Sequence, residues 1–365
     1  GGGGRGPVPR LGEVPRAAGR RRADQGATML LPSVTFLITG NGWPIPRRAG
    51  SVAAMTSAPS APVQQTISPR AWALMALLAA IWGGSFLSNR IALEEVGVLT
   101  TVAFRVAGAA LFLWAYVVLR GLAVPRGARW PAVFLGMGVL NNVIPFTLIV
   151  WGQQYIPSGL AAIFNASTAI FAVLLAALIF ADERLSVRKA VGVALGFAGV
   201  ATAIGIGNLA ALDLTSLGQL AIIGSSVSYA VASVFGRVFL KGIRPEVSAA
   251  GMLTGSALVM LPLALFAEGA PSFDYTAATW AALAYLAFAA SALAYILYYF
   301  VLGLAGAGNL SLVTLLVVPV AIVLGGLVYE EALQPADYAG FALLAFGLLI
   351  IDGRIERMLP RRTRA

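Results

Sequence analysis

The chain has no cysteine and no histidine among its 365 residues. Without cysteine it can form no disulfide, offer no thiol nucleophile and bind no metal through thiolate. Without histidine it lacks the side chain that most often serves as catalytic base, metal ligand or pH sensor near neutrality. These two absences exclude zinc proteases and Ser-His hydrolases among intramembrane enzymes. We therefore expect a protein that is not an enzyme and that holds no metal and no cofactor.

Charged residues are also scarce. Asp, Glu, Lys and Arg make up 11% of the chain, against about 25% in soluble domains. Much of the formal net charge of +10 comes from the first 70 residues, where nine arginines face only Glu13 and Asp24, a balance of +7. The basic charge is thus concentrated in a tail and not spread over a surface that would bind nucleic acid, so we expect no nucleic-acid partner.

Apolar residues, at 59%, are correspondingly abundant. From Trp72 onward, apolar runs alternate with short polar turns, and most runs approach the roughly 20 residues that a helix needs to cross a bilayer. This pattern predicts an all-α membrane protein with ten transmembrane helices. The predicted spans are 72–92, 99–119, 130–150, 159–180, 190–206, 217–240, 248–266, 277–301, 310–329 and 336–351.

Residues 1–70 differ from the rest in their high content of Gly, Arg and Pro, a composition that cannot bury enough apolar surface to offset the entropy of ordering. We interpret this segment as a disordered tail. The apolar stretch 29–39 is too short to span a bilayer. The segment from Met55 is more typical of a natural start, so we expect residues 1–54 to be dispensable. A second tail, 353–365, is basic.

The distribution of charge between the turns predicts an orientation, because cytoplasmic loops retain Lys and Arg. Alternate turns carry the basic residues, and the turns between them carry acids without Lys or Arg. Both termini are therefore expected in the cytoplasm. The basic turns contain Arg120, Arg126, Arg129, Arg184, Arg188, Lys189, Lys241, Arg244 and Arg354; the acidic turns contain Glu94, Glu95, Asp213, Glu268, Asp274, Glu330, Glu331 and Asp337.

The segment "FADERLSVRKAVG" at 180–192 has a counterpart in "VYEEALQPADYAG" at 328–340. A gapless shift of 148 residues superimposes Glu183 on Glu331 and Gly192 on Gly340. The chain is thus predicted to contain two repeats, 71–206 and 216–352, of five spans each. Because five is odd, the second repeat must enter the membrane from the opposite side, which is the inverted arrangement of many secondary transporters.

Several short motifs carry a resemblance to a known family. They are "WGGSF" at 82–86, "FR" at 104–105, and "GVALGFAGV" at 192–200 with its echo "GFALLAFGLL" at 340–349. With ten spans in two halves, the chain resembles the EamA-type transporters of the drug/metabolite transporter superfamily over about residues 70–352. The resemblance implies a multi-pass exporter or exchanger of small metabolites.

Polar side chains at mid-depth in a membrane are costly and tend to face a cavity or another helix. Trp82 is the clearest case, because halfway along a span it has no interface to anchor to. The alternative for the Ser and Thr residues is a bond to their own backbone or to a neighbouring helix. The candidate cavity residues are Trp82, Ser85, Asn141, Asn142, Asn165, Thr168, Ser228, Tyr229, Tyr295 and Thr314.

Charged residues near the ends of the spans are candidate gating or structural groups. Arg90 and Glu94 lie at one end of the first span, and Arg105 lies inside the second. A pairing of Arg105 with Glu94 or Glu95 would satisfy its charge and tether two helices. The alternative is a gate for substrate carboxylates.

Glu183 and Glu331 occupy equivalent turns on opposite sides of the membrane, which favours a role in shaping the helical hairpins. No carboxylate lies at mid-depth, so a proton relay of the usual kind is not predicted. Any coupling to protons would use these rim acids; otherwise an exchanged solute would drive transport.

The resulting prediction is a secondary transporter of the bacterial inner membrane, a monomer or homodimer, that moves a small-molecule substrate across the lipid bilayer by alternating access. The absence of buried acids and the family resemblance favour amphipathic or zwitterionic metabolites such as amino acids. A membrane scaffold or sensor without transport is the alternative.

Overall fold

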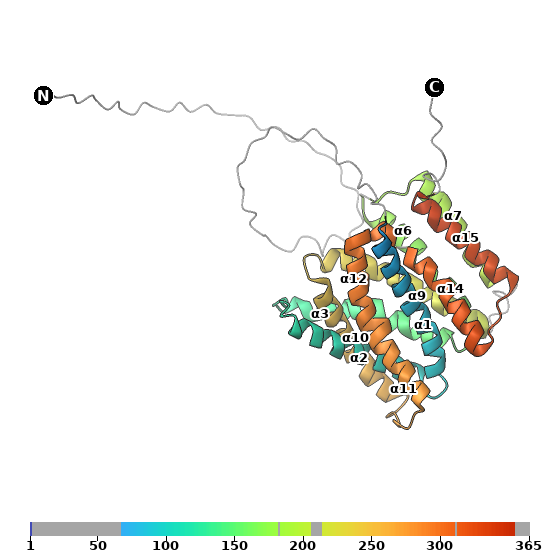
Figure 1. Ribbon diagram of the computed structural model, residues 1–365, viewed down its shortest axis with the longest axis horizontal. Coiled ribbons are helices and arrows are strands. Elements are labelled where there is room, and N and C mark those ends of the chain that lie inside the picture. The colour runs from blue at the N-terminus through green and yellow to red at the C-terminus, as the bar shows by residue number, and fades with distance from the viewer. Residues whose placement is uncertain (2–66, 182, 206–213, 311, 355–365) are drawn as a thin grey trace, which may run out of the picture. The chain divides into compact units, whose positions relative to one another are not determined.

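The computed structural model describes Gly1 and residues 67–181, 183–205, 214–310 and 312–354. Apart from Gly1, these residues belong to one compact unit, Pro62–Ala365. The predicted disordered tail 1–70 therefore lies almost wholly outside the described residues, as do Asp213 and most of the basic tail 353–365. Within the described ranges every regular element is a helix, as the sequence predicts (Figure 1).

The helices alternate with short turns along the chain. Their bounds are α1 (Pro69–Ala92), α2 (Val98–Leu119), α3 (Arg129–Gly138), η2 (Val139–Val143), α4 (Ile144–Gly152), α5 (Ser158–Ala166), α6 (Thr168–Ile179), α7 (Val187–Ile204), α9 (Leu214–Phe239), α10 (Pro245–Ala267), α11 (Ala277–Ala284), η3 (Tyr285–Leu293), α12 (Ala294–Ala305), α13 (Ala307–Leu310), α14 (Leu312–Tyr329) and α15 (Pro335–Ile351).

Nine continuous helical segments of the described chain are long and apolar enough to cross a membrane. Three of them join several elements: Arg129–Gly152 contains α3, η2 and α4, Ser158–Ile179 contains α5 and α6, and Ala277–Ala305 contains α11, η3 and α12. The tenth predicted span corresponds to α15, which is apolar but shorter, at 17 residues. The chain is thus a multi-pass helical membrane protein.

Local sequence explains where several helices begin. Ser68 accepts a hydrogen bond from the backbone N–H of Ala71 (3.2 Å), and Pro69 follows at the first helical position of α1. Proline fits there because the first turn of a helix has no acceptor for its missing N–H. Gln334 and Asp337 form a reciprocal capping box at the start of α15. Such caps satisfy backbone groups that the helix leaves unpaired.

The third and eighth spans each contain a π-helix, η2 and η3. Under the 148-residue shift, 139–143 falls on 287–291, which lies within η3, so the two widened turns occupy equivalent places. Pro145 lacks the N–H that would bond to the carbonyl of Asn141, which disturbs the helix beside η2. The eighth span has no proline at this place, and the sequence did not predict η3.

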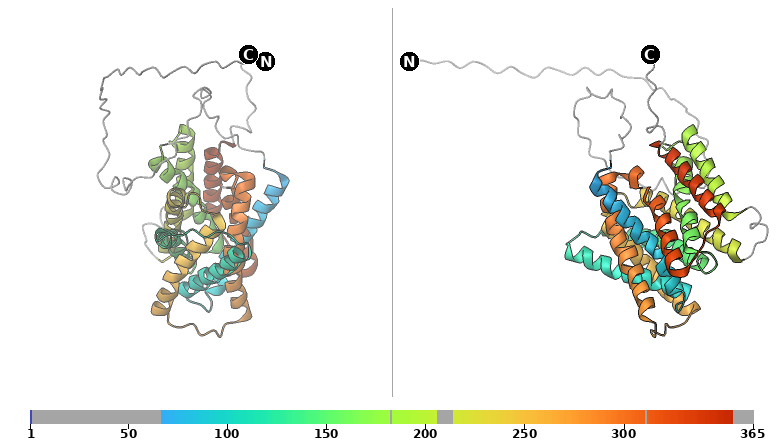
Figure 2. Two further views of the ribbon diagram at one scale, coloured as in Figure 1. Left: turned by 90° about the vertical axis from the view of Figure 1, so that its left-hand side faces the viewer. Right: turned by 45° about the vertical axis from the view of Figure 1, so that its right-hand side comes forward.

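The helix packing follows the repeat relation (Figures 1 and 2). α7 packs against α15 and α2 packs against α10, and each pair consists of equivalent helices. α1 packs against α14, and the equivalent pairing of α9 with α5 and α6 is also present. An approximate two-fold relation therefore exchanges each helix of one repeat with the equivalent helix of the other.

Glycines define the contact between α7 and α15. A Cβ on Gly199 would lie 2.5 Å from the carbonyl oxygen of Gly340, and a Cβ on Gly347 would lie 2.5 Å from that of Gly192. Residue numbers therefore rise along one helix as they fall along the other, so these equivalent helices are antiparallel. Small residues allow such close backbone approach, which stabilises helix pairs in lipid through van der Waals contact.

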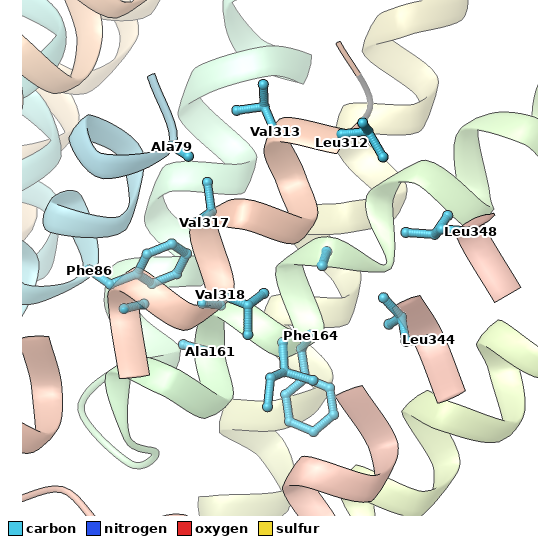
Figure 3. Close-up of a cluster of buried hydrophobic side chains, with 14 of the residues drawn as sticks. Ala79, Phe86, Ala161, Phe164, Leu312, Val313, Val317, Val318, Leu344 and Leu348 are labelled. Atoms are coloured by element: carbon cyan, nitrogen blue, oxygen red, sulfur yellow. The ribbon is translucent and has the colours of Figure 1, made fainter. Parts of the chain in front are cut away.

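The larger apolar cluster lies where α1, α5, α14 and α15 meet (Figure 3). Phe86, Phe164 and Val317 are buried there, together with Leu344 of α15. Lipid tails are as apolar as these side chains, so close packing and not exclusion of water is what favours this core. The cluster joins helices of both repeats and fixes their relative position.

Candidate functional site

Candidate residues from three helices meet beside η2. Asn141 donates to the Tyr295 hydroxyl (2.9 Å), and that hydroxyl donates to Oδ1 of Asn142 (2.8 Å). Asn142 in turn donates to Ser256 of α10 (2.9 Å). Ser228 of α9 donates to the carbonyl of Leu140 (2.7 Å). We call Asn141, Asn142, Ser228, Ser256 and Tyr295 the η2 polar cluster.

The members of the η2 polar cluster differ in exposure. Asn142 and Ser256 are fully buried, whereas Asn141 and Tyr295 keep part of their surface exposed. Because both functional groups of the Asn142 amide are used, this residue holds three helices together.

The other mid-depth candidates bond mostly within their own helix. Ser85 donates to the carbonyl of Trp82 (2.6 Å), and Thr168 donates to that of Asn165 (2.7 Å). Trp82 is half-buried, with its ring 5.8 Å from that of Tyr298 between centroids. The half-buried Asn165 has an Oδ1 atom without a hydrogen-bond partner among the described residues.

Two further candidates, Tyr229 of α9 and Thr314 of α14, are also half-buried. Tyr229 packs against both large apolar clusters of the bundle. Both side chains keep part of their surface exposed, but neither lines the cavity described below.

Arg105 does not form the ion pair with Glu94 or Glu95 that the sequence predicts. It is 6% exposed, its Nε donates to Ser291 of η3 (2.9 Å), and its guanidinium lies 3.8 Å from the centroid of the Phe146 ring. The expected pairing with Glu94 or Glu95 is wrong: among the described residues no ion pair joins Arg105 to an acid, and the two glutamates accept hydrogen bonds from Tyr329 and Thr276. Arg105 is thus a cation within the bundle whose contacts are a hydroxyl and an aromatic face.

The turns that contain Glu94, Glu95, Glu268 and Glu331 lie at one end of the bundle, here called the acidic end, and are linked by hydrogen bonds. Arg90 donates to the carbonyl of Gln153 (2.7 Å), and Glu94 accepts from the hydroxyl of Tyr329. The backbone N–H of Thr276 donates to Glu95 (2.8 Å) and lowers the pKa of that carboxyl. Four turns or helix ends are thereby linked.

Two carboxylates at the acidic end serve as helix caps. Glu268 accepts from the backbone N–H groups of Leu99 (2.9 Å) and Thr100 (2.8 Å) at the start of α2. Glu331 accepts from the backbone N–H (2.8 Å) and the hydroxyl (3.2 Å) of Ser158 at the start of α5. A carboxylate at a helix N-terminus is favoured by the helix dipole and by the unpaired N–H groups there. The caps fasten one helix to another.

Glu183, the repeat counterpart of Glu331, has a different environment. It lies at the opposite, basic end of the bundle, where Lys189 (3.2 Å) and Arg237 (3.4 Å) form ion pairs with it. The expected equivalence of the two glutamates therefore holds for their positions in sequence but not for their contacts. One caps a helix of the bundle, and the other is held by surface cations.

A cavity of about 540 Å³ opens beside Glu183. Small-molecule sites commonly fall within about 300–1,000 Å³. Its wall is mostly apolar and comes from α6, α9, α14 and α15, while charged groups gather at its rim. Of the predicted site residues, only Glu183 contributes to it. The lining is Ala169, Ala172, Val173, Ala176, Phe180, Glu183, Lys189, Ser233, Val234, Arg237, Leu312, Leu315, Leu348, Ile351 and Asp352.

Several polar residues with prominent contacts in the structure are not marked by any pattern in the sequence. Gln153 is fully buried, accepts from Asn89 (2.9 Å) and donates to the carbonyl of Phe86 (2.9 Å), although its sequence position suggests only a turn. Ser256 and Ser291 are isolated hydroxyls in apolar runs. The signal available for them was the cost of a hydroxyl at mid-depth, which applies equally to serines that bond to their own helix.

Two asparagines with different contacts provide the first test of this arrangement. We expect Asn142→Ala to lower the free energy of unfolding by about 1–2 kcal/mol, because it leaves Tyr295 and Ser256 without partners. Asn165→Ala removes the same group from a site where Oδ1 is unpaired, and it is expected to leave the melting temperature near wild type. The check is thermal unfolding of both variants in detergent; equal melting temperatures would contradict the assigned roles.

A bundle of apolar helices built from two equivalent halves, hollowed at one end and linked by caps at the other, is the architecture of a membrane transporter. The chain belongs to the EamA-like transporter family, whose profile matches residues 70–205 and again residues 216–352. This assignment agrees with the motifs at 82–86, 104–105 and 192–200. It places the protein in the drug/metabolite transporter superfamily.

Relatives with assigned activities are transporters as well. The chain is 26% identical over 301 residues to a probable terminal-alkyne amino-acid exporter of Streptantibioticus cattleyicolor, covering 82% of this chain and 97% of that one. It is 25% identical to a probable amino-acid metabolite efflux pump of Escherichia coli, covering 76% and 93%. A crystal structure at 21% identity superimposes with a TM-score of 0.56, over 80% of this chain and 99% of the other, which shows the shared fold.

Proposed function

We propose that this protein exports or exchanges small amphipathic or zwitterionic metabolites, with amino acids as the leading class, by alternating access. Amino acids or their metabolites are the substrates named for the two relatives above. The mostly neutral, aromatic interior of the bundle is suited to a ligand with an apolar side chain and balanced charge.

The observation that carries the proposal is the unequal environment of Glu183 and Glu331. Inverted repeats generate two alternating states when each half adopts in turn the conformation of the other. Here Glu331 fastens a helix start at the acidic end, whereas Glu183 lines a cavity at the basic end. In an alternating-access cycle, each state has one end closed and the other open. The different contacts of Glu183 and Glu331 correspond to the state in which the basic end is open.

The proposed location is the inner membrane, with both termini and the basic end in the cytoplasm. A reporter that is active only outside the cytosol is accordingly expected to be silent when fused after Arg126, Arg188 or Arg357. The same reporter is expected to be active after Asp213 or Asp274. Enzyme activity per fusion protein, normalised to its abundance, provides the measurement. A reversed result at either group of sites would contradict the proposed orientation.

The function is tested by transport in proteoliposomes that contain the purified protein. Vesicles loaded with a panel of labelled amino acids are expected to lose at least one of them faster than vesicles without protein. Counterflow with unlabelled solute and an imposed proton gradient would distinguish exchange from proton coupling. A membrane scaffold or sensor predicts no transport of any solute, and it predicts that alanine at Trp82, Asn165 and Thr314 together leaves cellular function intact.

A further inference from the structure

The geometry points to Arg105 as the group that binds the carboxylate of the substrate, in an aromatic site between α2, α4, α9 and the η3–α12 segment. This inference rests on the proposed function and narrows it. The substrates would be compounds with a free carboxylate and an apolar side chain, and a neutral amide of the same shape would bind poorly.

Arg105 uses only part of its hydrogen-bonding capacity. Its Nε donates to Ser291 (2.9 Å), which is the one hydrogen bond of the Arg105 side chain among the described residues. No Asp or Glu of the described chain lies within 4.0 Å of its guanidinium nitrogens either. Four N–H donors of a nearly buried guanidinium are therefore free to meet a ligand.

Three acids at the acidic end bind other groups. Glu94 accepts from Tyr329, Glu95 accepts from Thr276, and Glu268 caps α2. A cation within a membrane bundle is costly unless an opposite charge or water compensates it. A bound carboxylate would supply that compensation, and the planar fork of arginine matches its two oxygens.

Aromatic side chains surround the guanidinium. Phe146 lies against one face at 3.8 Å, and the Tyr229, Tyr285 and Tyr295 hydroxyls are near enough to interact with its charge. Tyr285 and Tyr295 donate their protons to the carbonyl of Ile81 (2.9 Å) and to Asn142 (2.8 Å). These rings would give an aromatic or aliphatic side chain attached to the bound carboxylate an apolar environment.

Ser291 fixes the orientation of the Arg105 guanidinium. With Nε held by that hydroxyl, rotation of the guanidinium is restricted and the terminal nitrogens keep one orientation. A pre-oriented group loses less entropy on binding than a free one. Ser291 is therefore a positioning residue for the proposed contact.

The experiment compares acids with their amides on the purified protein in detergent. The probes are L-phenylalanine, L-leucine and 3-phenylpropanoate, each with its carboxamide, and the readout is the dissociation constant by calorimetry. We expect at least one acid to bind at least tenfold more tightly than its amide to wild type. In Arg105→Gln that ratio is expected to fall to about one, and in Arg105→Lys to an intermediate value, because lysine keeps charge but not the fork.

Two results would overturn the inference: no acid of the panel binds more tightly than its amide to wild type, or Arg105→Gln keeps the wild-type ratio. If Arg105→Gln does not fold, Arg105→Lys and Ser291→Ala take its place, and an unchanged ratio in both is equally decisive. Transport of acid and amide at equal rates would reject the role of Arg105 and leave the transporter standing. Absence of transport with a normal acid-to-amide ratio would reject the proposed function instead.

Discussion

Gly199→Leu is expected to lower the free energy of unfolding by at least about 3 kcal/mol, the upper part of the range for overpacked cores. A Cβ at this position would lie 2.5 Å from the carbonyl oxygen of Gly340 and 2.7 Å from the backbone nitrogen of Leu344. Both neighbours are backbone atoms of α15, so no side-chain rotation can relieve the clash. The two helices must separate along their whole contact.

The matched control is Gly303→Leu, which introduces the same side chain into α12 at a glycine where the added Cβ has no atom within 4 Å beyond the adjacent backbone of its own helix. We expect its melting temperature to stay near wild type. Thermal unfolding in detergent, followed by size-exclusion chromatography of the surviving monodisperse protein, measures both. Similar losses in the two variants would mean that a leucine is harmful in any helix, and the proposed importance of the α7–α15 contact would fail.

Glu331→Gln is expected to release the acidic end of the bundle and to impair transport. The carboxylate accepts two hydrogen bonds from Ser158 at the start of α5, and a neutral amide loses the attraction to the helix dipole. The difference between a charge-assisted and a neutral hydrogen bond is about 1 kcal/mol. The population with this end closed would therefore fall about fivefold relative to the open one.

Glu330→Gln makes the same change of charge one residue away, at an exposed side chain, and is expected to leave the balance unchanged. Spin labels on Gln154→Cys and Ala332→Cys would report the distance across the cap. No native cysteine has to be removed first, because the chain contains none. An unchanged distance distribution in Glu331→Gln would show that the cap does not hold this end closed.

Much of the fold followed from composition and periodicity. The apolar spans and the repeat relation between 180–192 and 328–340 were predicted, the spans because hydrocarbon length imposes them directly. The π-helix η3 was not predicted, because its sequence contains no proline and no local pattern that indicates a widened turn. Its equivalence to η2 becomes visible only when the packing is known.

The site was harder to predict than the fold. Sequence indicates that Asn142 and Asn165 are polar at mid-depth, but only the structure distinguishes an amide with both groups bonded from one with an unpaired oxygen. Arg105 was expected to pair with Glu94 or Glu95, which lie close before it in the sequence, because opposite charges near one end of a bundle commonly meet. Instead the backbone N–H of Thr276 and the hydroxyl of Tyr329 bind those acids, and such partners come from distant spans that no local pattern identifies.

The crossed glycine contacts between α7 and α15 have a consequence for how a chain of this kind can arise. Gly192 meets Gly347 and Gly199 meets Gly340, so each glycine faces the counterpart of the other under the 148-residue shift. Two copies of the first repeat, inserted in opposite orientations, could therefore make the same pair of contacts with their own residues. A polypeptide of half the length carries both sides of this interface, and fusion of two such copies into one chain would fix a pairing that was already self-complementary.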